Sequence, residues 1–206
     1  GAQAMRAEAV AMLDRARTIG LNALILQVRP AADAIYPSAL EPWSEYLSGT
    51  QGRLPWHDGE APWDPLAFWV QEAHARALEL HVWFNPYRAR HSAAKSPPAP
   101  THVAVRAPQL VRSYGDMLWM DPGEPGSAAH TLAVVADVLR RYDVDGVHID
   151  DYFYPYPVAQ RGADLPFPDD VPFARYVAGG GLLSRDDWRR ANVDAMVQAM
   201  HQLVRS

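Results

Sequence analysis

The sequence contains no cysteine, which excludes disulfide bonds, thiolate nucleophiles and zinc–thiolate sites together. No apolar run approaches the roughly 18 residues that a membrane-spanning helix requires. Acidic and basic residues are scattered, and the net charge of −5 includes no run of like charge, unlike a nucleic-acid-binding or polybasic membrane-binding surface. These absences favour a neutral or weakly charged partner.

Several signatures of known enzyme classes are also missing. The sequence has no P-loop, no G-x-G-x-x-G after a strand, no G-x-S-x-G turn and no H-E-x-x-H pair. The opening residues, GAQAMRAEAV, lack the basic, apolar and small-residue segments of a signal peptide. Because the chain starts without an initiator Met and inside a helical pattern, we expect a trimmed chain or a fragment.

The 206 residues, 49% of them hydrophobic, predict one domain over residues 1–206 with a sizeable core. Helical spacing of apolar residues over 5–19, 64–78 and 127–142 leads each time into an extended segment, at 22–30, 79–88 and 145–151. A last helix is expected to start at Ser184, with Asp187 at its third position as in a capping box. Helices that alternate with strands indicate right-handed crossovers and a parallel sheet.

The loops are short before each predicted strand and long after it, over residues 31–63, 89–126 and 152–183. Within the second, DMLWM is strand-like. This asymmetry favours a (β/α)8 or TIM barrel, whose sites lie at the carboxyl ends of the strands. A complete barrel has eight strands, so the three seen here predict a partial barrel. An open doubly wound sheet uses the same edge and is the alternative.

Alternation divides each predicted strand into two faces. Leu80, Val82 and Phe84 exemplify the uniformly apolar face, which should meet the helices. The other face becomes polar at the carboxyl end of all three strands, although burying an unpaired polar group costs roughly 1–3 kcal/mol. This predicts a polar cluster at one mouth, made of Gln27, Arg29, Asn85, His148 and Asp150, joined from the loops by Tyr87, Arg88, Asp151, Tyr152, Tyr154 and Tyr156.

Carboxylates beside aromatic rings suit sugar binding, because rings stack on apolar sugar faces while polar groups bind hydroxyls. Tyr36 and Trp83 are further aromatic residues that could stack on a sugar. Glycoside hydrolysis requires two carboxyl groups, and strand alternation directs the adjacent Asp150 and Asp151 apart, so they are not expected to be the complete pair. A noncatalytic glycan-binding module and a metal-dependent carbohydrate esterase or deacetylase remain as alternatives, as does a purely structural role in which Asp150 caps a turn or pairs with Arg29.

Five stretches resemble the glycosyl hydrolase-like 10 family of bacterial envelope proteins: QVRPAADAIYPS, DPLAFWVQEAHARALELHVWFNPYR, LWMDPGEP, RRYDVDGVHIDDYFYPYP and DWRRANVDAMVQAM. They occur in the family's order and span nearly the whole chain. The resemblance implies a TIM-barrel glycosidase linked to the glycan strands of the cell wall. The matching strand-end motif residues are Gln27, Arg29, Asn85, Arg88, His148, Asp150 and Asp151.

The family domain begins one strand earlier than this chain and continues through strands five to eight. The resemblance therefore implies that the second catalytic carboxyl group belongs to the absent part. It also implies a periplasmic or secreted location in the bacterial envelope, with a lipid anchor in some members.

We therefore expect a glycoside hydrolase that acts on a bacterial glycan, with peptidoglycan sugar strands as the leading substrate. Asp150 is the expected nucleophile or transition-state stabiliser, and Asp151 is the second candidate, as catalyst or as an acid that orients Asp150. We expect a monomer with no cofactor, no metal, no nucleic-acid partner and no membrane span. The expected substrate-binding residues are Gln27, Arg29, Tyr36, Trp83, Asn85, Tyr87, Arg88, His148, Tyr152, Tyr154 and Tyr156.

Overall fold

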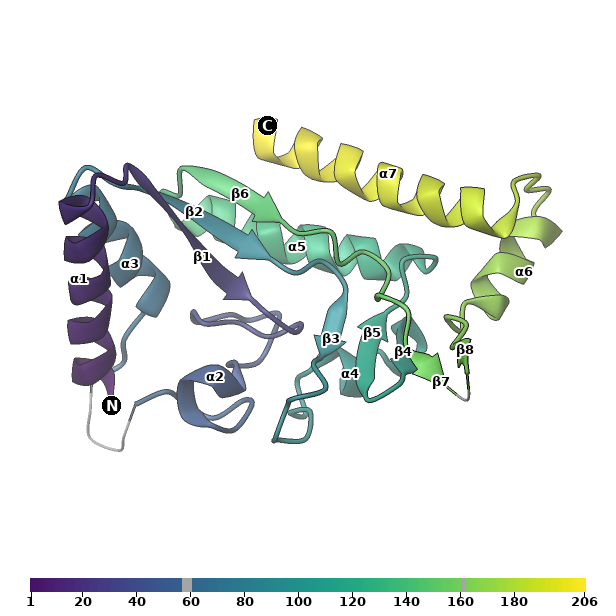
Figure 1. The fold of residues 1–206 in the computed structure, drawn as a ribbon, viewed down its shortest axis with the longest axis horizontal. Helices are drawn as coiled ribbons and strands as arrows, with labels where there is room; N and C mark the ends of the chain where they lie inside the picture. The colour runs from purple at the N-terminus through teal and green to yellow at the C-terminus, as the bar shows by residue number, and fades with distance from the viewer. Residues whose placement is uncertain (57–60, 161) are drawn as a thin grey trace.

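The computed structural model describes residues 1–56, 61–160 and 162–206 and has a mixed α/β fold (Figure 1). The helices are α1 (Ala2–Thr18), α2 (Glu45–Ser48), α3 (Pro65–His74), α4 (Val103–Arg106), α5 (Pro125–Arg141), α6 (Asp170–Ala178) and α7 (Arg185–Arg205), with a 3₁₀ turn at Pro108–Leu110. The strands are β1 (Ala23–Arg29), β2 (Glu79–Phe84), β3 (Arg88–Arg90), β4 (Val111–Tyr114), β5 (Met117–Met120), β6 (Gly146–Ile149), β7 (Ala159–Gln160) and β8 (Ala163–Asp164).

A parallel sheet of three strands, in the order β1-β2-β6, organises the fold. Each of these strands follows a long helix, namely α1, α3 or α5, as the sequence pattern predicted. The parallel sheet is therefore confirmed. The strands do not close into a barrel within the described residues.

The helix ends follow local chemistry. Asp64 caps α3, because its carboxylate accepts the Ala67 N–H at 3.1 Å and Pro65 occupies the first helical position. Ser184 caps α7 in the same way through the Asp187 N–H at 3.2 Å, as predicted. The α3 helix stops at His74, short of the predicted residue 78, and the following turn holds Ala77 at φ 54, a left-handed conformation outside the helical region.

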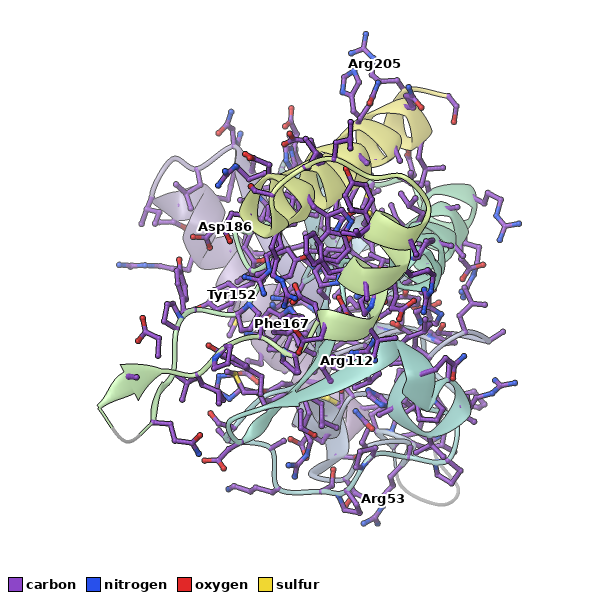
Figure 2. All side chains as sticks on the ribbon, turned by 90° about the vertical axis from the view of Figure 1, so that its right-hand side faces the viewer. Arg53, Arg112, Tyr152, Phe167, Asp186 and Arg205 are labelled. Carbon is purple, nitrogen blue, oxygen red and sulfur yellow. The ribbon has the colours of Figure 1, made fainter. Side chains whose placement is uncertain are left out.

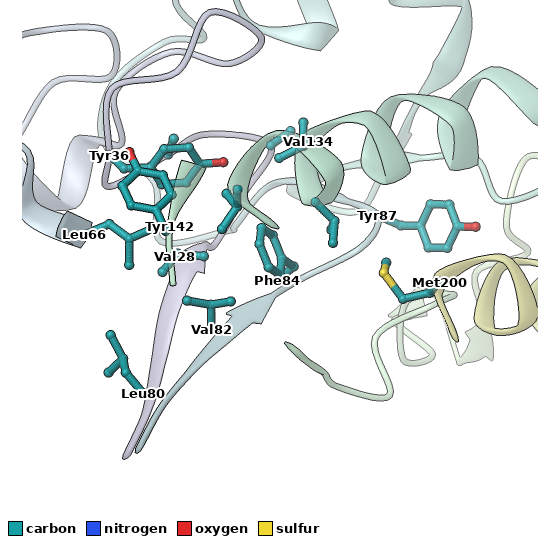
Figure 3. Close-up of a cluster of buried hydrophobic side chains, with 14 of the residues drawn as sticks. Val28, Tyr36, Leu66, Leu80, Val82, Phe84, Tyr87, Val134, Tyr142 and Met200 are labelled. Atoms are coloured by element: carbon teal, nitrogen blue, oxygen red, sulfur yellow. The ribbon is translucent and has the colours of Figure 1, made fainter. Parts of the chain in front are cut away.

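One face of the parallel sheet is covered by apolar side chains. Leu80, Val82 and Phe84 are fully buried along β2 and belong to the same cluster as Val134 of α5 (Figure 3). Figure 3 follows this core from Leu66 of α3 to Tyr87 and Met200, the latter on α7. The opposite face is open, and Ile25 on it is 55% exposed.

A β-bulge near the end of β1 changes the predicted face assignment. Gln27 pairs with Trp83, but Arg29 pairs with Phe84, so Val28 is an extra residue in β1. An extra residue shifts every later side chain to the other face. Arg29 therefore shares the covered side of the sheet with Phe84, and the prediction that it shares the open face with Gln27 is wrong.

The long loops contain more regular structure than the sequence suggested. The strand-like DMLWM segment corresponds to β5, which lies between β3 and β4 in an antiparallel sheet. The predicted uninterrupted loop over 152–183 is wrong, because it contains β7, β8 and α6, and the first turn of α6 tolerates Pro172. The loop predicted over 31–63 includes residues 57–60, which lie outside the described residues. None of the described helices is long and apolar enough to cross a membrane.

Candidate active site

Three side chains form a row across the open face of the parallel sheet. Gln27 of β1 lies in register with Trp83 of β2, and Trp83 lies in register with His148 of β6. The Trp83 and His148 rings meet edge to face, with centroids 5.8 Å apart. All three side chains are partly exposed, as a surface that contacts a ligand requires.

Asp150 follows β6 directly and is held by neighbouring donors. The Trp83 indole N–H donates to one carboxylate oxygen at 3.1 Å, and the Asn85 amide nitrogen lies 3.3 and 3.4 Å from the two oxygens. The Tyr152 backbone N–H adds a third donor at 3.3 Å. Donors from β2, from the residue after it and from the 150–157 segment thus fix the orientation of a partly exposed carboxylate.

Asn85 links this carboxylate to the chain that leaves β2. Its side-chain oxygen accepts the Arg88 backbone N–H at 2.8 Å, while its nitrogen faces Asp150. Arg88 Nε donates to the Pro30 carbonyl at 3.0 Å, and the guanidinium lies 5.4 Å from the Tyr152 ring centroid. Arg88 therefore connects the end of β1 with residues 152–156, which contain three tyrosines and which we call the tyrosine segment.

Asp151 has different surroundings from Asp150. Its exposed carboxylate accepts a hydrogen bond from the Tyr156 hydroxyl, and this bond raises the pKa of Tyr156. The Tyr156 ring meets the Tyr152 ring edge to face at 5.0 Å. The two adjacent carboxylates therefore have different side-chain partners: Trp83 and Asn85 bind Asp150, whereas Tyr156 binds Asp151.

The ion-pair partner of Arg29 is Glu41 and not Asp150. Its guanidinium is fully buried and binds Glu41, with Nη2 2.6 Å from Oε1, and Nη1 donates to the Asn85 carbonyl at 2.6 Å. His130 Nε2 also lies 2.9 Å from Glu41. Burial, the largest single influence, would raise the pKa of Glu41, but the charge of Arg29 and the hydrogen bonds with His130 and Arg29 together outweigh it and lower that pKa to about 2. The expected substrate contact and the alternative pairing of Arg29 with Asp150 are both replaced by this buried ion pair.

Two predicted aromatic contacts also lie in the interior. Tyr36 and Tyr87 are 1% and 0% exposed, and burial raises the pKa of both hydroxyls. Tyr36 packs edge to face on Tyr142 with centroids 5.8 Å apart. These two tyrosines are therefore core residues and do not contact a ligand from solvent. The partly buried Tyr154 packs against Phe167, with centroids 5.3 Å apart, and lies beside the Asp150 cluster along the chain.

The structure adds supporting residues that the sequence reasoning did not single out. The buried Trp119 of β5 donates its indole N–H to the Phe153 carbonyl at 2.9 Å, and its ring lies 6.2 Å from that of Tyr152. Trp119 thus holds the backbone and one ring of the tyrosine segment in place. The LWMDPGEP motif contains Trp119, whereas nothing in the sequence marks Glu41 as the partner of Arg29. Among the described residues, no group of three His, Asp or Glu side chains is arranged to hold a metal ion.

The parallel sheet and its flanking helices define a mixed α/β fold that is shared with proteins of known structure. The structure resembles alpha-L-fucosidase isoenzyme 2 from Paenibacillus thiaminolyticus, with a TM-score of 0.58 over 96% of this chain and 27% of that one, at 12% identity. It also resembles a hypothetical protein from Ruminiclostridium thermocellum, with a TM-score of 0.53 over 91% of this chain and 83% of that one, at 12% identity. At such low identity the likeness concerns the fold alone.

Sequence comparison shows the family. Residues 2–206 match the model of glycosyl hydrolase-like 10, and the chain belongs to this family, as its motifs predicted. It is 41% identical over 201 residues to the glycosyl hydrolase YngK of Bacillus subtilis, covering 97% of this chain and 37% of that protein. It is 34% identical over 205 residues to the glycosyl hydrolase DigH of Escherichia coli K12, covering 94% of this chain and 43% of that protein. The chain thus spans less than half the length of both relatives.

Proposed function

We propose that this chain is part of a TIM-barrel glycoside hydrolase that acts on a bacterial glycan, with Asp150 as a catalytic carboxylate. The observation that carries the proposal is the fixed carboxylate at the end of β6, oriented by Trp83 and Asn85 beside an open row of polar and aromatic side chains. Membership of a glycosyl hydrolase-like family supports the reaction class. The parallel sheet with its helices supports a partial barrel.

Asp150 is suited to act on a sugar carbon that acquires positive charge. Glycoside hydrolysis passes through an oxocarbenium-like transition state, which a carboxylate stabilises by its charge or traps as a nucleophile. Donors that fix the carboxylate in advance avoid the cost of reorienting it during the reaction. Asp151 is the second candidate, as catalyst or as an orienting acid. The remaining carboxyl group of the catalytic pair is assigned to the longer polypeptide that the relatives possess.

Peptidoglycan sugar strands are the leading substrate of this proposal. The resemblance to envelope glycosidases supports a cell-wall glycan and a periplasmic, secreted or lipid-anchored location, and the relatives YngK and DigH are bacterial. Trp83, Tyr152 and Tyr156 would supply ring faces for the sugar, while Gln27 and His148 would bind its hydroxyls. The proposed enzyme is a monomer that uses no cofactor.

The experiment compares Asp150→Asn with Asp151→Asn in the complete protein. Purified glycan strands, with and without stem peptides, are incubated with each variant, and the products are identified by mass spectrometry. Asp150→Asn is expected to lower the cleavage rate at least about a hundredfold while the melting temperature stays unchanged. The adjacent Asp151→Asn substitution is the control for a loss of charge at this loop and should cost less.

Normal cleavage by Asp150→Asn would remove Asp150 from the catalytic role. Strands that stay intact with the parent protein but co-sediment with it would instead indicate a noncatalytic glycan-binding barrel. Activity that disappears on exhaustive chelation would favour a metal-dependent esterase or deacetylase.

A further inference from the structure

A groove outside the Asp150 cluster lies between the chain around residues 154–167 and the first turns of α7. Figure 2 views the molecule from the side facing this region and labels Phe167 and Asp186, both of which line the groove. Tyr154, Pro157 and Val193 contribute further apolar surface. We call this feature the tyrosine–proline groove. None of its lining residues belongs to the carboxylate cluster described above.

One segment of chain connects the two places. In the 150–157 segment, Tyr152 donates its N–H to Asp150, and Tyr156 donates its hydroxyl hydrogen to Asp151. Tyr154 and Pro157 of the same segment line the tyrosine–proline groove. The groove and the candidate active site are therefore built in part from the same short segment of chain.

The walls of the groove are held in place without a ligand. The Tyr114 hydroxyl accepts the Val158 N–H at 3.2 Å and donates to the Leu165 carbonyl at 2.9 Å. The Leu165 N–H donates in turn to the Val158 carbonyl at 2.8 Å, which ties the two flanks to each other. The Phe167 ring meets the Tyr154 ring edge to face. A ligand that enters such a formed site loses less free energy to the ordering of side chains and loops.

The charges around the groove disfavour an anionic ligand. Arg189 is committed to Asp169, with nitrogen–oxygen distances of 2.6 and 2.8 Å, and Arg190 is committed to Asp187 at 2.6 Å. The lining also includes the carboxylates of Asp164, Asp186 and Asp194, all on exposed residues. Proline and tyrosine surfaces bordered by acceptors suit a ligand with apolar ring faces and hydroxyl or amide donors.

We propose that the tyrosine–proline groove is a second sugar-binding site, which takes neutral sugar units of the same glycan strand that occupies the Asp150 site. This inference rests on the proposed function, because it takes the ligand to be the glycan strand that the Asp150 site would cleave. It assigns to α7 a direct role in binding substrate and predicts that longer strands bind more tightly than short ones.

The test measures binding and does not depend on turnover. Isothermal titration of the complete protein carrying Asp150→Asn compares a disaccharide with an octasaccharide of N-acetylglucosamine, a neutral probe. Asp194→Trp places a bulky ring in the groove at an exposed helical position, and Ala195→Trp is the matched control, because Ala195 is exposed and does not line the groove. Thermal melting verifies that both variants remain folded.

The octasaccharide is expected to bind about tenfold more tightly than the disaccharide to the background protein and to Ala195→Trp, and Asp194→Trp should remove that gain. Equal octasaccharide affinity in Asp194→Trp and in the background protein would overturn the proposal. In one outcome, the octasaccharide binds more tightly than the disaccharide and Asp194→Trp removes that difference, while the protein with native Asp150 releases no products from glycan strands. That result would support the second sugar-binding site and contradict the proposed hydrolase activity. If the protein with native Asp150 cleaves the strands, but Asp194→Trp and the background protein bind the octasaccharide equally tightly, the hydrolase proposal is supported and the second sugar-binding site is contradicted.

Discussion

At the scale of single residues, the carboxylates of this protein have two different environments. Glu41 is buried with Arg29 and His130 in the interior, whereas Asp150 is partly exposed and held by neutral donors of Trp83 and Asn85. A buried acid without its cation would be strongly destabilising, so the first arrangement maintains the fold. The second leaves an accessible carboxylate that can meet a ligand.

The Glu41–Arg29 pair predicts a specific loss of stability in acid. The pKa of Glu41 is lowered from 4.5 to about 2, so its contribution is fully present above pH 4.5 and is lost as the pH falls toward 2. Between pH 6 and pH 3 this contribution should fall by about 2 kcal/mol. Urea unfolding at both pH values measures it. Glu41→Gln, which is expected to be less stable at pH 6, should lack this component, and an unchanged pH dependence in the variant would contradict the assignment.

Alternation along β2 and β6 was sufficient to bring Trp83, Asn85, His148 and Asp150 together from the sequence. It failed for Arg29, because Val28 continues the apolar alternation of Leu24 and Leu26, so nothing in the sequence marks it as the extra residue of a bulge. The partner of Arg29 was equally invisible, since Glu41 lies in an irregular loop and is paired only by the tertiary fold. Local patterns therefore predicted the neighbours within the sheet and missed the contacts between sheet and loop.

At the scale of elements, the start of α7 is fixed by aromatic packing against the turn before α5. Trp188 of α7 is buried, packs against Phe173 and lies close to Gly123. A methyl group at position 123 would overlap the edge of the Trp188 ring. The absence of a side chain at Gly123 thus allows α7 to approach the core.

Gly123→Ala is therefore expected to destabilise the protein by about 1–3 kcal/mol, through displacement of Trp188. Gly179→Ala is the matched control, because Gly179 has φ −78 and an added methyl group would meet atoms no closer than 3.4 Å. The control should change the free energy of unfolding by less than about 0.5 kcal/mol. Urea denaturation of both variants measures the difference, and equal stabilities would disprove the packing argument.

Most of the elements that the sequence predicted have long apolar periodicity, namely α1, α3, α5, α7 and the three parallel strands, and the short DMLWM run added β5. The short β4 and the helix α6 escaped prediction, because the 89–126 and 152–183 segments are rich in proline and glycine. In α6, Pro172 lies in the first turn, where its missing N–H does no harm. Whether such short elements form depends on the tertiary structure against which they pack.

At the scale of the whole molecule, one apolar cluster joins the two ends of the chain. Leu13 of α1 and Met200 of α7 belong to the same cluster as Val82 at the centre of the sheet. The terminal helices are thus parts of one core.

We therefore predict that residues 1–206 unfold in a single cooperative transition. Trp63, Trp83, Trp119 and Trp188 lie in four different parts of the fold, so tryptophan fluorescence reports on all of them. The fluorescence midpoint in urea should coincide with the midpoint measured by far-ultraviolet circular dichroism. Two separated midpoints would indicate two independently folding units and would contradict the single-domain prediction.

The bulge at Val28 also constrains protein engineering. Chimeric barrels are made by exchanging strand–helix modules between relatives at matched positions, with strand length as the usual guide. For β1, matched length is insufficient, because the extra residue turns Arg29 toward Glu41. A donor strand without this insertion would direct the cation to the open face of the sheet and leave Glu41 without its counter-charge. Module boundaries in this family should therefore keep β1 and the loop that carries Glu41 together as one transferable unit.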